Sequence, residues 1–162
     1  MTIRKGLGGL AVTAGATALL LTGMTTAAHA AGGPSGGIWR LQNVQTGLCL
    51  TDNTSKVTTS SCSTTSLYQK WDYKRVGDRI QLENQGTGRC LKPTNPFSLY
   101  LESRPCGIGT NDLWDEYFVS GKLRLVMNGN ALDSDAKGNA YLKQYGDTNP
   151  YQQWYLTTSI PG

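Results

Sequence analysis

The side chains best suited to chemistry are concentrated between residues 130 and 154, in the segment NALDSDAKGNAYLKQYGDTNPYQQW. Its stretch DSDAKGNAYLKQ, which starts at Asp133, has the length and the first aspartates of an EF-hand calcium loop. Such a loop needs an oxygen ligand at position 5 and a bidentate glutamate at position 12. Lys137 and Gln144 occupy these positions, so the segment does not predict a calcium site.

Catalytic chemistry is not predicted either. A Ser-His-Asp or Cys-His arrangement needs a histidine, and the single histidine, His29, lies in a segment that we expect to be removed. Glycoside hydrolysis needs two carboxylates about 5 to 10 Å apart in a cleft. The pairs Asp133/Asp135 and Asp115/Glu116 exist, but nothing in the sequence places either pair in a cleft. We therefore expect no enzyme, no catalytic residue, no metal and no cofactor.

The N-terminus has the pattern of a secretory signal peptide. Two basic residues, Arg4 and Lys5, precede an uncharged run that ends on AHAA, where Ala28 and Ala30 have the small-x-small spacing of a signal peptidase site. We expect residues 1–30 to be cleaved and the protein to be secreted and extracellular. A membrane anchor is the alternative, but the run is diluted by glycine and barely long enough to span a bilayer. The sequence AGGPSGG at 31–37 predicts a flexible Gly-rich lead-in.

The charge of the chain excludes two classes of partner. The formal net charge is +4, and it falls to about +2 when Arg4 and Lys5 are removed with the signal. No cluster of lysine and arginine is present in the remaining sequence. Nucleic acid and membrane insertion are therefore not expected.

The chain contains three copies of one unit, spaced by about 40 residues. YQKW at 68–71 recurs as YQQW at 151–154, and a weaker copy, NDLW, lies at 111–114. Upstream, LQNVQTGLCL (41–50) aligns with LENQGTGRCL (82–91), and with LVMNGNAL (125–132), which is two residues shorter. The repeats are expected at 38–76, 79–119 and 122–158, within one domain at 38–158.

The repeat alignment also predicts the disulfides. Four cysteines allow three connectivities, and the third repeat has lost both of its cysteines together: Ala131 and Tyr145 stand at their positions. Joint loss is expected of partners within a repeat. We therefore predict the bonds Cys49–Cys62 and Cys90–Cys106, each closing a loop of about 15 residues worth roughly 3 kcal/mol.

Short strands account for the rest of each repeat. Segments such as IWRLQN, RIQLE and KLRLVM alternate β-branched, aromatic and leucine residues between Gly, Asn and Pro turns. The chain is therefore all-β, with about four strands per repeat. A propeller is the alternative, but three blades are too few to close one. Three such repeats close well as a β-trefoil.

The repeated residues resemble a known family. CL…C…QKW, CL…C…DLW and AL…QQW are similar to the QxW repeats of the R-type lectins, the ricin B-chain-like β-trefoils, and LDSDAKGNAY is similar to a segment of their actinobacterial secreted members. The resemblance covers essentially all of 38–158. It implies that Trp71, Trp114 and Trp154 pack in a shared core and that the motif glutamine fixes the strand around each of them.

The resemblance implies fixed positions for the groups that bind sugar in this family. They are an aspartate two residues after the first cysteine, an aromatic residue two residues before the second, and often an amide just before QxW. Repeat 1 has Thr51, Ser60 and Tyr68 there, with Asp52 one residue late and expected to face the other side of its strand. Repeat 2 has Lys92, Arg104 and Asn111. Neither repeat is expected to bind sugar in the family manner.

Repeat 3 keeps the carboxylate. Asp133 stands at the family position, Lys143 occupies the aromatic position, and Tyr141 lies two residues before it on the same side of the strand. The predicted carbohydrate site consists of Asp133, Tyr141, Lys143, Tyr151 and Gln152. The alternative is that Asp133 caps a turn while the tyrosines fill the space of the lost disulfide.

The sequence therefore predicts a binding protein whose partner is a glycan, of galactose type or related. A rival hypothesis is a degenerate lectin scaffold that binds a secreted protein partner, as an adaptor or targeting subunit of a secreted complex or toxin. One shallow sugar site binds at about mM, so useful affinity needs several sites presented together.

Overall fold

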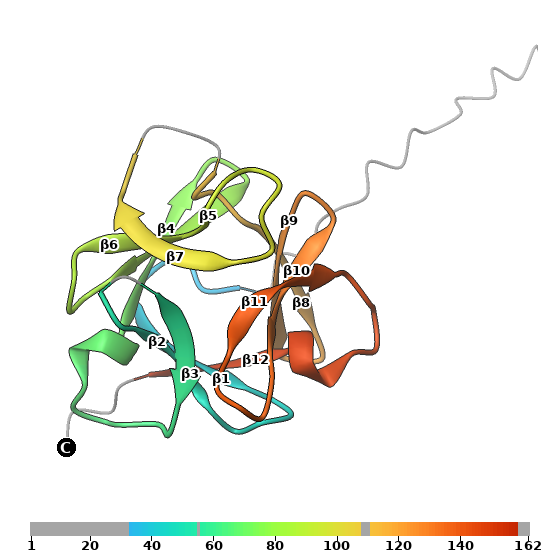
Figure 1. The fold of residues 1–162 in the computed structure, drawn as a ribbon, viewed down its shortest axis with the longest axis horizontal. Coiled ribbons are helices and arrows are strands. Elements are labelled where there is room, and N and C mark those ends of the chain that lie inside the picture. The colour runs from blue at the N-terminus through green and yellow to red at the C-terminus, as the bar shows by residue number, and fades with distance from the viewer. Residues whose placement is uncertain (1–32, 55, 108–110, 159–162) are drawn as a thin grey trace, which may run out of the picture.

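A computed structural model describes residues 33–54, 56–107 and 111–158, and the predicted signal peptide lies outside these ranges. The described residues form twelve short strands and two single-turn 3₁₀ helices, arranged as three four-stranded units (Figure 1). No helix in these ranges is long and apolar enough to cross a membrane. The elements are β1 Ile38–Asn43, β2 Cys49–Asp52, β3 Val57–Ser60, η1 Leu67–Gln69, β4 Trp71–Val76, β5 Arg79–Asn84, β6 Arg89–Pro93, β7 Leu101–Pro105, β8 Asp115–Val119, β9 Lys122–Met127, β10 Asn130–Ser134, β11 Ala140–Gln144, η2 Pro150–Gln152 and β12 Trp154–Thr158.

The first and last strands of each unit close into a six-stranded antiparallel barrel. Within this ring β1 pairs with β4, β4 with β5, β8 with β9, and β9 with β12, which returns to β1. Contact between β5 and β8 is made by an antiparallel bridge from Ile80 to Trp114. The chain thus begins and ends its barrel on neighbouring strands, which removes open sheet edges from the ring. This ring with its three hairpins confirms the predicted β-trefoil.

The middle strands of each unit form the hairpins β2–β3, β6–β7 and β10–β11, which cover one end of the barrel. They also contact one another. Thr59 in β3 donates its amide to the carbonyl of Gly138 (2.8 Å), and its hydroxyl lies 3.0 Å from that of Ser134. A Cβ at position 138 would lie 2.8 Å from the Thr59 carbonyl oxygen, and Gly138 has φ +86°, so this contact requires glycine.

The three motif tryptophans occupy equivalent places in the core. Trp71, Trp114 and Trp154 are 0% exposed. Each indole N–H donates to the carbonyl of the leucine that follows the first cysteine position, at 3.0, 3.1 and 3.0 Å: Leu50, Leu91 and Leu132. A buried indole needs such a partner. The repeated tryptophan therefore joins the barrel to the hairpin of its own unit.

Both predicted disulfides are confirmed. Cys49 bonds to Cys62 and Cys90 to Cys106, with Cα–Cα distances of 5.0 and 4.9 Å. In the third unit Tyr145 stands at the position of the second cysteine, and its ring lies 6.0 Å from that of Tyr117 in β8, centroid to centroid.

The end of the predicted flexible lead-in lies against the barrel. The Gly37 carbonyl accepts a hydrogen bond from the Tyr73 amide (2.8 Å), and the Gly36 carbonyl accepts one from the Trp39 indole (3.2 Å). Arg75 donates to the Pro34 carbonyl (3.3 Å). The carbonyls of Pro34, Gly36 and Gly37 are thus joined to β1 and β4 by hydrogen bonds.

Candidate functional site

The retained carboxylate of the third repeat lies where the β10–β11 hairpin meets η2. Asp133 in β10 pairs with Tyr141 in β11, so the two side chains stand on the same face of the hairpin. Asn149, the residue before η2, donates from Nδ2 to Asp133 Oδ2 (3.2 Å), and its own Oδ1 accepts from the Tyr151 amide (3.1 Å). One asparagine therefore caps the short helix and holds the carboxylate.

Tyr141 is the second partner of this carboxylate. Burial raises the pKa of Tyr141 to about 12, and the charge of Asp133 and a hydrogen bond to it add to the effect. The hydroxyl is therefore protonated at neutral pH and available as a donor. Tyr151 adds the last of the contributions that raise the pKa of Tyr141.

The carboxylate is nearly closed off in this conformation. Asp133 is 1% exposed and Tyr151 is 38% exposed, and Lys143, two residues after Tyr141 in β11, is exposed. The site thus combines a buried carboxylate acceptor with the Asn149 amide and the Tyr141 hydroxyl. A ligand hydroxyl can reach Asp133 by replacing the Tyr141 hydroxyl or the Asn149 amide as its donor.

Gln152, which is predicted to belong to the site, is buried and bonded to the backbone. Its side chain is 0% exposed, Nε2 donates to the Gln144 carbonyl (2.9 Å), and Oε1 accepts from the Gly146 amide (2.9 Å). Gln69 of the first repeat makes the equivalent pair of bonds, to Ser61 O at 3.0 Å and from Ser63 N at 2.7 Å. The motif glutamine therefore supports the chain beside the site through both its amide nitrogen and its amide oxygen.

A turn-capping aspartate is present, but it is Asp135. Its carboxylate accepts from the amides of Lys137 (2.9 Å) and Asn139 (3.0 Å) and from the Asn139 side chain (2.8 Å). The Asn139 bonds are the main reason that the pKa of Asp135 lies below its ordinary value. Among the described residues, the Asp133 carboxylate accepts from the Asn149 and Tyr141 side chains and from no backbone amide.

The corresponding places in the first two repeats are occupied by hydrogen bonds within the fold. The Thr51 and Ser60 hydroxyls lie 2.8 Å apart and both accept from Gln69. In repeat 2, Lys92 donates to the Pro105 carbonyl (3.2 Å), the acceptor equivalent to those used by the motif glutamines. The motif residue there is Asp112, which has no amide to donate.

Asp52 points away from the family position, as its one-residue offset predicts. Its carboxylate accepts from the hydroxyls of Ser103 (2.7 Å) and Thr87 (2.5 Å) and from the Thr54 amide (2.8 Å). Asp52 is 1% exposed and joins the first repeat to the second. Its role is structural.

The residue that sequence reasoning missed is Asn149. The family pattern directed attention to the residue just before QxW, which is Tyr151. The available signal was the Asn-Pro dipeptide at 149–150, which is typical of a helix cap with proline at the first helical position.

Comparisons with known proteins agree with this architecture. The sequence matches the family described as ricin-type beta-trefoil lectin domain over residues 37–154. A search of curated protein sequences gave no match. Similar solved structures include the designed threefold-symmetric protein ThreeFoil, with 23% identity, a TM-score of 0.67, and coverage of 75% of this chain and 98% of that one.

Two natural proteins are similar at the level of fold. The Macrolepiota procera ricin B-like lectin, solved in complex with lactose, is 14% identical with a TM-score of 0.64, over 76% of this chain and 96% of that chain. A Clostridium perfringens endo-β-galactosidase that releases GlcNAcα1-4Gal is 23% identical with a TM-score of 0.66. The match covers 74% of this chain but 32% of the enzyme.

Proposed function

Because the chain belongs to the ricin-type β-trefoil lectin family, we propose that it is a secreted carbohydrate-binding protein with one family-type sugar site, in its third repeat. Asp133 and Asn149 contact the sugar hydroxyls, Tyr141 and Tyr151 form the wall, and Lys143 lies at the rim. The expected glycan carries galactose or a related residue. The role is binding rather than catalysis.

The observation that carries this proposal is the set of partners of the Asp133 carboxylate. It is buried, and its partners are neutral donors, an amide and a phenol hydroxyl, with no ion pair to it among the described residues. A buried carboxylate that no cation neutralises is a strong acceptor for hydroxyl protons. Sugar hydroxyls donate and accept in the same way as the phenol that they would replace.

The test uses the mature chain from residue 31, folded with its disulfides, on a broad panel of immobilised glycans. Asp133→Ala removes the carboxylate, and Asp133→Asn keeps its shape and removes its charge. Asp78→Asn, an exposed aspartate in the β4–β5 turn, is the matched control. Glycan binding that both Asp133 variants lose and the control keeps supports the proposal. Equal binding by all variants rejects this site, and silence of the folded protein across the panel rejects the function.

A protein partner is the second candidate, because one loop exposes several large apolar side chains. Phe97 is 95% exposed, Tyr100 75% and Leu99 50%, all in the β6–β7 loop. Contiguous exposed apolar side chains often mark interaction sites. This candidate predicts a secreted partner that is retained by Asp133→Asn and lost on replacing Phe97 and Leu99 by serine. The reverse pattern favours the sugar site.

A further inference from the structure

The three junctions between repeats are not equivalent, and the difference is located at a single asparagine position. At the junction of repeats 3 and 1, Asn43 donates to the Tyr151 carbonyl (2.7 Å) and accepts from the amides of Gln45 (3.1 Å) and Thr46 (3.0 Å). We call this arrangement the asparagine clamp. It ties the turn after the first strand of one repeat to the residue before the motif glutamine of the preceding repeat.

The same clamp joins repeats 1 and 2. Asn84 donates to the Tyr68 carbonyl (2.9 Å) and accepts from the amides of Gly86 (2.9 Å) and Thr87 (3.2 Å). A backbone hydrogen bond accompanies each clamp, from Val44 to Gln153 and from Gln85 to Lys70, both 2.9 Å. These two junctions are therefore closed by side-chain and backbone bonds together.

At the junction of repeats 2 and 3 the clamp is missing. The equivalent residue is Met127, whose thioether cannot donate to the Asn111 carbonyl. The turn is also two residues shorter, and Asn128 (φ +50°) and Gly129 (φ +75°) form it alone. Asn128 and Leu113 stand at the positions equivalent to Val44 and Gln153. Among the described residues, no backbone hydrogen bond joins these two.

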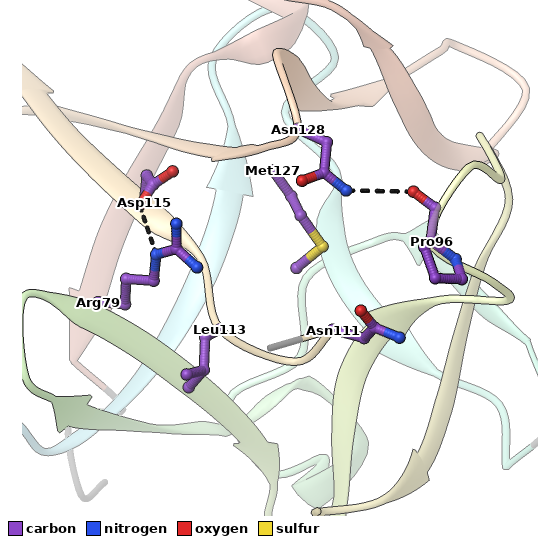
Figure 2. A pocket seen from close by; sticks show the side chains of 7 residues that line it. All are labelled: Arg79, Pro96, Asn111, Leu113, Asp115, Met127 and Asn128. Carbon is purple, nitrogen blue, oxygen red and sulfur yellow. Dashed lines mark hydrogen bonds and ion pairs between the residues drawn. The ribbon is translucent and has the colours of Figure 1, made fainter. Parts of the chain in front are cut away.

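A cavity of about 430 Å³ opens at this place. Figure 2 shows the Met127 side chain extending into it between two polar pairs, the Arg79–Asp115 ion pair and the Asn128–Pro96 hydrogen bond. The lining residues are Arg79, Pro96, Asn111, Leu113, Asp115, Met127 and Asn128. Its volume lies within the roughly 300 to 1,000 Å³ of small-molecule sites.

The chemistry of the lining selects against several ligand classes. Arg79 Nε lies 2.8 Å from Asp115 Oδ1, so the two charges compensate each other and neither an anion nor a cation is favoured. An entirely apolar ligand would leave the amide side chains of Asn111 and Asn128 without the partners that water gives them. The apolar part of the wall is formed by Leu113, Met127 and Pro96.

We propose that this cavity is a second saccharide site, which uses Asn111, the amide just before the second tryptophan motif, but neither Lys92 nor Arg104 of the family positions. A neutral ligand with many hydroxyls satisfies two amides, which both donate and accept, while its C–H face covers the apolar wall. The inference rests on the proposed carbohydrate function. The cavity shares no residue with the Asp133 site, so the chain presents two separate sites, and a branched or repeating glycan gains avidity by binding both.

The cavity has room for an oligosaccharide. Beyond the bond from Asn128 Nδ2 to Pro96 O (3.1 Å) lies a smaller space of about 160 Å³, lined also by Phe97 and Leu142. The two spaces share Pro96, Met127 and Asn128. The Phe97 ring, 95% exposed, is available there for the apolar face of a second sugar ring.

The test titrates ¹⁵N-labelled mature chain with lactose and with the methyl glycosides of glucose, mannose and N-acetylglucosamine, and follows each residue by NMR. We expect two independent sets of shift changes. One set includes Met127 and the side-chain amides of Asn111 and Asn128, and the other includes Asp133, Tyr141 and Asn149. The double variant Asn111→Ala/Asn128→Gly should lose only the first set, and Asp133→Asn only the second. Glycine is chosen at 128 because of its positive φ.

Phe97→Ala should weaken lactose binding at the cavity several-fold, whereas Tyr100→Ala, an exposed residue of the same loop outside the lining, should not. Changes at the Asp133 set alone overturn the second site and leave the proposed function standing. Changes at the cavity set alone support the second site and reject the assignment of the family-type site. With the spectrum of a folded protein, an absence of changes at both sets overturns both proposals.

Discussion

Asn149 donates a hydrogen bond of 3.2 Å to the carboxylate of Asp133, sixteen residues earlier in the chain. The bond connects the cap of η2 to the centre of the β10–β11 hairpin, and the same asparagine accepts from the Tyr151 amide. The position of the carboxylate therefore depends on a residue whose local role is to begin a single helical turn.

Replacing Asn149 separates these two roles. Asn149→Ala removes both bonds and should lower the free energy of unfolding by about 1 kcal/mol, and it should weaken glycan binding. Asn149→Ser can still cap η2 but is too short to reach Asp133. We expect near-normal stability from the serine variant with the same weak glycan binding. Denaturant unfolding and glycan titration measure the two effects, and equal binding by the serine variant and the parent would contradict the assignment.

The titration of Tyr141 reports its contact with Asp133. The pKa of Tyr141 is raised to about 12, first by burial and then by the Asp133 carboxylate. Asp133→Asn removes the charge but not the burial. The pKa of Tyr141 should therefore fall, yet stay above its ordinary value of 10.0. NMR of ¹³C-labelled tyrosine follows the ionisation directly. Asp78→Asn should leave it unchanged, and the same Tyr141 titration in both variants would show that the two groups are not in contact.

The asparagine clamp of the first two repeats should contribute strongly to stability. Asn84→Ala leaves the Tyr68 carbonyl and the amides of Gly86 and Thr87 without their partner, at a cost of about 1–3 kcal/mol. Gln85→Ala is the control, because that side chain is exposed and its backbone bond to Lys70 remains. Denaturant unfolding compares the two, and a loss no larger than that of the control would show that the clamp contributes little.

Stability should depend on pH through Glu116. This side chain is 9% exposed, and burial raises its pKa above the ordinary value of 4.5, although Tyr73 donates to it and Arg75 pairs with it. The folded state then binds the proton more tightly than the unfolded state does. The stabilisation is present below pH 4.5 and is lost as the pH rises through the raised pKa.

Glu116→Gln keeps an acceptor for the Tyr73 hydroxyl but cannot ionise. Its free energy of unfolding should lack the decline that the parent shows as the pH rises above 4.5 and through the raised pKa of Glu116. Denaturant unfolding at a series of pH values measures both proteins. Parallel curves for parent and variant would assign the pH dependence to other groups.

Much of the fold could be predicted from the sequence because the repeat is itself a local signal. Ala131 and Tyr145 replace both cysteines of the third repeat, and this joint loss predicted the two disulfides that the structure has. The recurring tryptophans marked one position of each repeat, and all three are buried. The one-residue offset of Asp52 gave its orientation, since successive strand side chains face opposite sides. These inferences depend only on spacing along the chain.

The candidate site was predictable only in part. The sequence by itself determined that Asp133 remains where two other repeats hold Thr51 and Lys92. Tertiary structure decided that Asn149 holds this carboxylate, that Gln152 is committed to backbone partners, and that Met127 leaves a cavity at one junction. The physical reason is that burial and hydrogen-bond partners are set by how repeats pack against one another, and spacing within a repeat does not specify that packing.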